Sequence, residues 1–168
     1  VDPLSALYRV NLAHLLLAAG RYESALAEMR RAQALSPRLE EVRNDIAVVL
    51  LLSGRTDDAR QSLTGAPEGL TRDRLRVLLG PPTDSQAALA RLEADPSARS
   101  HFLQAEIAAH RGDHDLAFGR LEAALRVHDL TGSQLDFDLA HAITLSPFLR
   151  PLHDDPRWQT LRTGLTSP

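Results

Sequence analysis

The chain has 168 residues, 43% of them hydrophobic and 24% charged, which suits one compact domain or a short array of repeats. All 19 basic residues are Arg and Cys is absent, which excludes lysine Schiff bases, P-loop lysines, thiolate nucleophiles, thiolate metal sites and disulfides. The net charge of -3, with a pI near 6.2, provides no basic field for nucleic acid or an anionic membrane.

The composition also predicts an all-helical protein. Leu and Ala, which stand high in helix propensity, supply 31 and 24 residues, whereas aromatic residues make up 4% of the chain. No apolar run approaches the roughly 20 residues of a membrane-spanning helix. The chain begins with Val and opens on no signal segment, so we expect a domain excised from a longer protein. We expect it to be cytoplasmic, or periplasmic if the parent protein is anchored in a membrane.

A short sequence pattern recurs along the chain. Gly20 and Ala25 are followed 34 residues later by Gly54 and Ala59, and the same Gly-to-Ala spacing returns at 112 and 117. Gly80 divides the longer interval, which suggests a shortened third copy. Each Gly follows an apolar helical stretch, where it can take the left-handed conformation that ends a helix. Each Ala lies early in the next helix, where a small side chain permits close helix packing.

These turns predict four antiparallel helical hairpins in chain order. The hairpins are expected at residues 4–37, 39–64, 70–95 and 97–129, followed by a capping segment at 133–168. In the first helix Leu12, Leu15, Leu16 and Ala19 form an apolar stripe at helical spacing. Pro37 and Pro96 end the first and third hairpins, because the residue before a proline disfavours the helical region. We expect all of residues 1–168 to form one domain.

The spacing of 34 residues and the Gly-to-Ala core resemble tetratricopeptide repeats (TPR). The matches in the first unit are Leu12, Ala13, Leu16, Gly20, Tyr22, Ala25, Met29, Ala32 and Pro37, while Arg9 departs from the family by occupying its tryptophan slot. The resemblance implies a right-handed α-solenoid of about four hairpins. The resemblance extends to the C-terminal TPR arrays of bacterial multidomain regulators, such as cyclases, kinases and transcription regulators. The use of Arg for every basic residue is typical of a GC-rich bacterial coding bias.

The C-terminal segment is expected to cap the array. A repeat array exposes an apolar face on its last helix, and a terminal segment must cover that face. Phe148, Leu152, Trp158 and Leu161 are suited to this role. Asp155 is expected to cap a short helix that Pro156 begins.

Candidate catalytic and metal-binding patterns are weak. His110 and His114 have the spacing of zinc ligands on a helix, but Gly112 between them is expected to break that helix. The adjacent carboxylates Asp57 and Asp58 do not face each other on a helix and are poor acid–base pairs. We therefore expect no catalytic residue, no metal site, no cofactor and no enzymatic activity. The alternative of a small metal-dependent enzyme stays open to a metal analysis.

The resemblance implies a partner-binding groove lined by the first helix of each hairpin. The candidate groove residues are Asn11, His14, Glu41, Asn44, Asp45, Phe102 and Glu106. An extended or helical peptide with apolar anchors and a basic residue facing the acidic side chains would suit this surface. The lysine clamp that chaperone-binding members use is not expected, because Val10 fills one of its slots and the chain has no Lys.

Two functional readings remain. The first is a non-catalytic scaffold for signalling that binds a protein or peptide, with no nucleic-acid binding and no membrane insertion. The second is a self-associating or regulatory module that controls an attached catalytic or DNA-binding domain. In a homo-oligomer, the apolar flank around Leu50, Leu51 and Leu52, together with the shortened helix expected at 56–63, would contact another copy.

Overall fold

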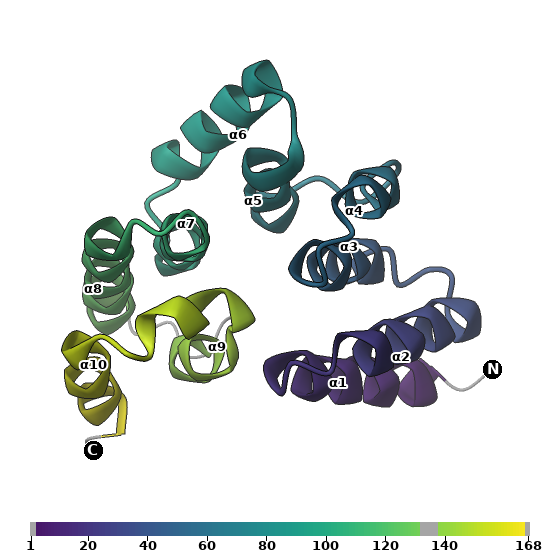
Figure 1. The fold of residues 1–168 in the computed structure, drawn as a ribbon, viewed down its shortest axis with the longest axis horizontal. Helices are drawn as coiled ribbons and strands as arrows, with labels where there is room; N and C mark the ends of the chain where they lie inside the picture. The colour runs from purple at the N-terminus through teal and green to yellow at the C-terminus, as the bar shows by residue number, and fades with distance from the viewer. Residues whose placement is uncertain (1–2, 132–137, 167–168) are drawn as a thin grey trace. The chain divides into compact units, whose positions relative to one another are not determined.

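The computed structural model describes residues 3–131 and 138–166, and these residues form helices with no β-strand (Figure 1). The elements are α1 (Pro3–Ala18), α2 (Tyr22–Leu35), α3 (Val42–Leu52), α4 (Thr56–Ser62), α5 (Leu70–Leu79), α6 (Pro82–Ala94), α7 (Ala98–His110), α8 (His114–Thr131), α9 (Leu139–Leu145), the 3-10 helix η1 (Pro147–Leu152) and α10 (Pro156–Thr166). The predicted fold class, an all-α array of about four helical hairpins followed by a C-terminal segment, is confirmed. Residues 133–137 and 167–168 of the predicted cap lie outside the described residues.

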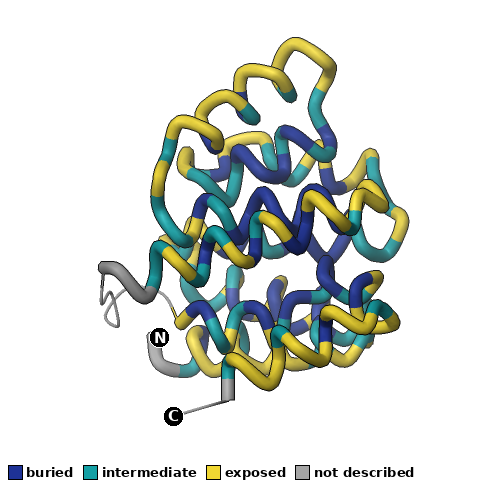
Figure 2. Tube along the Cα trace, turned by 90° about the vertical axis from the view of Figure 1, so that its left-hand side faces the viewer, coloured by how far each residue is buried: buried dark blue, intermediate teal, exposed yellow. Residues whose placement is uncertain are grey.

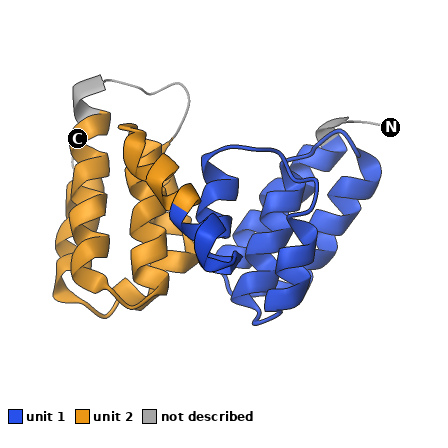
Figure 3. Ribbon diagram, turned by 90° about the horizontal axis from the view of Figure 1, so that it is seen from above, with its two compact units in different colours: residues 1–86 blue, residues 87–168 orange. Residues whose placement is uncertain are grey.

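The chain divides into two compact units (Figure 3). Unit 1 comprises Val1–Gln86, and unit 2 comprises Ala87–Pro168, so the boundary falls inside α6. Each unit has its own buried residues. The expectation of one domain over 1–168 stays a prediction.

Three of the four turn glycines adopt the conformation that the repeat pattern predicts. Gly20, Gly54 and Gly112 have φ of 75°, 80° and 80°, a region that L-residues with a Cβ rarely occupy. The backbone N–H groups of the next residues, Arg21, Arg55 and Asp113, donate to carbonyls five positions earlier, at 2.8, 2.8 and 2.9 Å. This is the Schellman arrangement, which satisfies the free carbonyls at a helix end. The alanines that follow, at 25, 59 and 117, are fully buried.

Gly80 works differently, which corrects the expectation of a left-handed turn there. It has φ of -76° and ψ of 165°, an extended backbone that any residue can adopt. A Cβ at this position would lie 2.6 Å from the carbonyl oxygen of Arg76, so the position requires Gly because the preceding turn of α5 is too close. Gly80 is therefore needed because the carbonyl group of Arg76 lies so close to it, and not because of a positive φ.

In unit 1, α2 packs between α1 and α3, and α3 also contacts α4 and α5. The largest fully buried side chains here include Leu26 and Met29 of α2, Val49 of α3 and Leu75 of α5. Figure 2 shows buried segments alternating with exposed ones along the helices, as expected for helices that each cover one face. The unit therefore has a core built mainly by α2 and α3.

In unit 2, the segment predicted to cap the array packs onto the hairpin of α7 and α8. The 3-10 helix η1 and α9 contact α7, and Phe148, Leu152 and Trp158 are buried, while Leu161 is half-buried. Asp155 accepts a hydrogen bond from the backbone N–H of Arg157 at 2.9 Å, which confirms its predicted role at the start of α10. Hydrogen bonds from Arg157 also lower the pKa of Asp155 to about 2.

Candidate partner-binding surface

The predicted groove residues of unit 1 include one ion pair between α1 and α3. The Nε2 atom of His14 lies 3.3 Å from Oδ2 of Asp45, and the two side chains are 45% and 26% exposed. The hydrogen bond to Asp45 raises the pKa of His14 above its ordinary value of 6.5, and this effect outweighs the burial that lowers it. His14 and Asp45 were both predicted as groove residues, and in the structure they contact each other.

The other predicted residues of unit 1 differ in accessibility. Asn11 on α1 and Glu41, the residue before α3, are exposed. Asn44 is only 5% exposed, and its Oδ1 atom accepts no hydrogen bond from the described part of the chain. Asn11, His14, Glu41 and Asp45 therefore form the accessible polar group, which we call the α1–α3 surface, while Asn44 lies beneath the molecular surface.

Phe102 and Glu106 do not lie on an open surface, which corrects their assignment to a groove. Both residues are on α7 and are buried within unit 2, at 5% and 3% exposure. Ser146, just before η1, donates a hydrogen bond from Oγ to Oε1 of Glu106 at 2.6 Å. The C-terminal segment packs against α7 at this point, so it covers the face that the sequence analysis assigned to a ligand.

Helix α1 exposes large apolar side chains that are not among the candidate groove residues. Of the five exposed large apolar side chains in the described residues, four lie on this helix: Leu7, Tyr8, Leu12 and Leu15, at 48%, 74%, 46% and 56% exposure. Leu12 and Leu15 belong to the apolar stripe noted in the sequence, and the structure leaves both of them exposed. The buried side of α1 consists of two small residues, Ala6 and Ala13, and one leucine, Leu17. This side lies where α1 packs on α2. The face of α1 that is buried is therefore the one with the smaller residues.

A charged network fixes α1 to α2 beside this surface. Arg9 of α1 donates from Nη1 to Oε2 of Glu28 on α2 at 2.7 Å, and Arg31 donates to the other carboxylate oxygen. Hydrogen bonds from Arg9 and Arg31 lower the pKa of Glu28, with Arg9 contributing most. Arg9 occupies the slot of the family's tryptophan, so an ion pair connects the two helices where an aromatic side chain is usual.

The geometry of the ion pair predicts a pH-dependent signal. Replacing Asp45 by Asn should lower the pKa of His14, because the acceptor that favours the imidazolium ion loses its charge. The pair stabilises the fold fully below about pH 6.5, the unfolded value, and this contribution disappears as the pH rises through the raised pKa of the folded state. An NMR titration of the His14 ring protons measures the change. Asp57→Asn, which removes a carboxylate 94% exposed on α4, should leave the titration unchanged; an unchanged titration in Asp45→Asn would contradict the assignment.

The described residues contain no group of three or more His, Asp or Glu side chains that could hold a metal ion. His110 is the last residue of α7 and His114 is the first residue of α8. Gly112 lies in the turn between these helices, as predicted. None of the helices that the structure describes is long and apolar enough to cross a bilayer.

Comparison with protein families agrees with the repeat pattern. Two family models, each described as tetratricopeptide repeat, match residues 10–77 and 79–131. The chain belongs to the tetratricopeptide repeat family. No curated protein and no solved structure shows significant similarity to it.

TPR domains are in general protein–protein interaction modules, and the family is typically a non-catalytic scaffold. The apolar run considered for self-association is not available as a surface. Leu50 and Leu51 of α3 are buried inside unit 1 and Leu52 is half-buried. These leucines contribute to packing, whereas the large apolar side chains that are exposed among the described residues of unit 1 lie on α1.

Proposed function

We propose that this TPR domain is a non-catalytic scaffold that binds a protein or peptide partner through α1 and the α1–α3 surface. The main support for this proposal is that exposed apolar side chains are concentrated on one helix. Helix α1 carries Leu7, Tyr8, Leu12 and Leu15. Contiguous exposed apolar residues rimmed by polar groups are typical of interaction sites, whereas single exposed leucines are ordinary.

The chemistry of the surface suggests an amphipathic helical partner. Along α1, the face with Tyr8, Leu12 and Leu15 adjoins the face with Asn11 and His14, because the two sets differ by one position. A partner helix with apolar anchors at i and i+3 or i+4 would cover the first face. The exposed carboxylate of Glu41 and the half-buried carboxylate of Asp45 favour a basic residue on the side of the partner that meets the second face.

Affinity capture from a lysate of the source organism, followed by identification of the retained proteins and measurement of their Kd, tests the proposal. We expect the intact chain to bind an identified partner and the double variant Leu12→Ser/Leu15→Ser to lose it. Glu41→Gln/Asp45→Asn should weaken binding most at low ionic strength, because exposed charges act mainly through steering. All variants must retain the far-ultraviolet circular dichroism of the intact chain.

Leu116→Ser provides the matched control, since Leu116 is 48% exposed on α8 in unit 2 and should not affect the interaction. A partner that binds all the α1 variants as tightly as the intact chain would contradict the proposal. Retention of only further copies of the chain, lost in the α1 variants, would instead support the self-association alternative through the same helix.

A further inference from the structure

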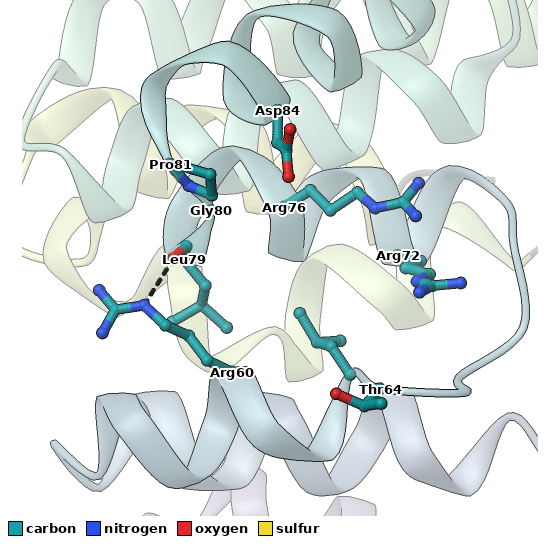
Figure 4. Close-up of a pocket in the computed structure, with 9 residues that line it drawn as sticks. Arg60, Thr64, Arg72, Arg76, Leu79, Gly80, Pro81 and Asp84 are labelled. Atoms are coloured by element: carbon teal, nitrogen blue, oxygen red, sulfur yellow. Dashed lines mark hydrogen bonds between the residues drawn. The ribbon is translucent and has the colours of Figure 1, made fainter.

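Unit 1 contains a pocket that neither the repeat pattern nor the α1–α3 surface accounts for. It has a volume of about 270 Å3 and is formed by the end of α4, by α5 and by the start of α6 (Figure 4). This is slightly below the roughly 300–1,000 Å3 of sites for small molecules, and it suits one or two side chains of a peptide. The lining residues include three arginines, at positions 60, 72 and 76.

The pocket combines an apolar wall with a cationic end. Leu63, Leu79 and Pro81 supply apolar surface. Figure 4 shows the guanidinium groups of Arg72 and Arg76 together at one end, with that of Arg60 at the opposite end. Arg60 donates from Nε to the carbonyl oxygen of Leu79 at 2.7 Å and from Nη1 to Asp57 at 2.6 Å. Its guanidinium group is therefore already engaged in hydrogen bonds within the chain.

Arg72 and Arg76 hold a carboxylate that belongs to the chain itself. Arg76 binds Glu68 through both terminal nitrogens, with Nη1 2.7 Å from Oε2 and Nη2 3.0 Å from Oε1. Arg72 donates from Nη1 to Oε1 at 2.6 Å. Bidentate arginine–carboxylate pairs of this kind are geometrically specific. The two arginines are therefore already arranged around the Glu68 carboxylate, and Nη1 of Arg76 also lies 3.5 Å from Oδ1 of Asp73.

The carboxylate and its arginines differ in their exposure to solvent. The side chain of Glu68 is 69% exposed, whereas those of Arg72 and Arg76 are 16% and 27% exposed. Arg72 also donates to the carbonyl oxygen of the buried Ala66 at 2.6 Å, so a second hydrogen bond holds this arginine besides the one to Glu68. The exposed Glu68 side chain can rotate into water, and an incoming carboxylate would then take over its hydrogen bonds to both arginines.

We propose that Arg72 and Arg76 form a binding site for the carboxylate of an acidic peptide, and that Glu68 is an internal occupant which this carboxylate displaces. A neighbouring aliphatic side chain of the peptide would lie against Leu63 and Leu79. A carboxylate fits better than a phosphate, because Asp84 lines the pocket and repels a doubly charged ligand more strongly than a singly charged one. This site lies apart from the α1–α3 surface and does not depend on the function proposed above.

Binding of a defined probe tests the site in the full 168-residue chain. The probe is a fluorescent tetrapeptide of sequence Gly-Leu-Glu-Gly with both ends blocked, compared with the same peptide carrying Gln in place of Glu. We expect Glu68→Gln to bind the acidic probe at least about tenfold more tightly than the intact chain, the scale of a charge-assisted hydrogen bond. Arg76→Gln in the Glu68→Gln background should abolish the gain, and Arg76→Lys should restore part of it, because Lys keeps the charge and loses the planar fork.

Glu122→Gln removes an equally exposed glutamate, at 65%, from α8 in unit 2 and should bind the probe as the intact chain does. Three results would overturn the proposal: no gain in Glu68→Gln, equal binding of the acidic and Gln probes, or a gain that persists after Arg76→Gln. Inorganic phosphate that competes as strongly as acetate would overturn the assignment to a carboxylate. Circular dichroism of each variant excludes misfolding as the cause of a loss.

Discussion

Replacing Phe148 by Ala should lower the free energy of unfolding of unit 2 by about 3–5 kcal/mol, the range for truncating a large buried aromatic residue. Phe148 is 2% exposed in η1, which packs on α7, and its ring meets the ring of His110 edge-on with centroids 5.6 Å apart. The truncation leaves a cavity under the C-terminal segment and removes the aromatic contact. Urea unfolding followed by far-ultraviolet circular dichroism measures the effect.

Leu116→Ala is the control for this experiment, because it removes apolar atoms from α8 of the same unit at a position 48% exposed. Its expected cost is within about 0.5 kcal/mol, as for most surface substitutions. If Phe148→Ala cost no more than Leu116→Ala, the C-terminal segment would not be part of the core of unit 2.

Replacing Leu26 by Ala should destabilise unit 1 by about 2–5 kcal/mol. Leu26 is 2% exposed on α2, the helix that contacts both α1 and α3, so the cavity lies where the first two hairpins meet. Leu15→Ala on α1 is the matched control, since that leucine is 56% exposed and should cost little. Similar losses in the two variants would contradict the burial of α2 described above.

Together the two core variants test the prediction that residues 1–168 form one domain. In repeat proteins each repeat is stabilised by its neighbours, so an uninterrupted array unfolds cooperatively. A single domain predicts that Phe148→Ala and Leu26→Ala shift one shared transition. Two transitions, each of which responds to only one of the substitutions, would contradict that prediction.

Features that depend on local chemistry could be predicted from the sequence. The φ angles of Gly20, Gly54 and Gly112 follow from the few residues around each turn, because a left-handed position at a helix end favours Gly wherever it occurs. Burial of Ala25 and Ala59 also follows from the repeat, since the spacing of 34 residues places the same small side chain at the same helix contact. Asp155 caps α10 through a hydrogen bond to a residue only two positions away.

Features that depend on which face is covered could not be predicted in this way. Leu12 and Leu15 have the spacing of a buried stripe, yet the side of α1 with Ala13 packs on α2. Gly80 matched the turn pattern, but the carbonyl of Arg76 explains its necessity. Periodicity identifies an apolar face without stating whether another helix covers it.

The amino-acid sequence is therefore sufficient to predict the repeat, the all-helical fold class, the turn positions and the absence of lysine and cysteine chemistry. Which polar and charged groups meet depends instead on how the chain folds. Ser146 and Glu106 are 40 residues apart in sequence, and His14 pairs with Asp45 from another hairpin. Hydrogen bonds and ion pairs act over a few ångströms in space, so their partners are known only when the chain has brought them together.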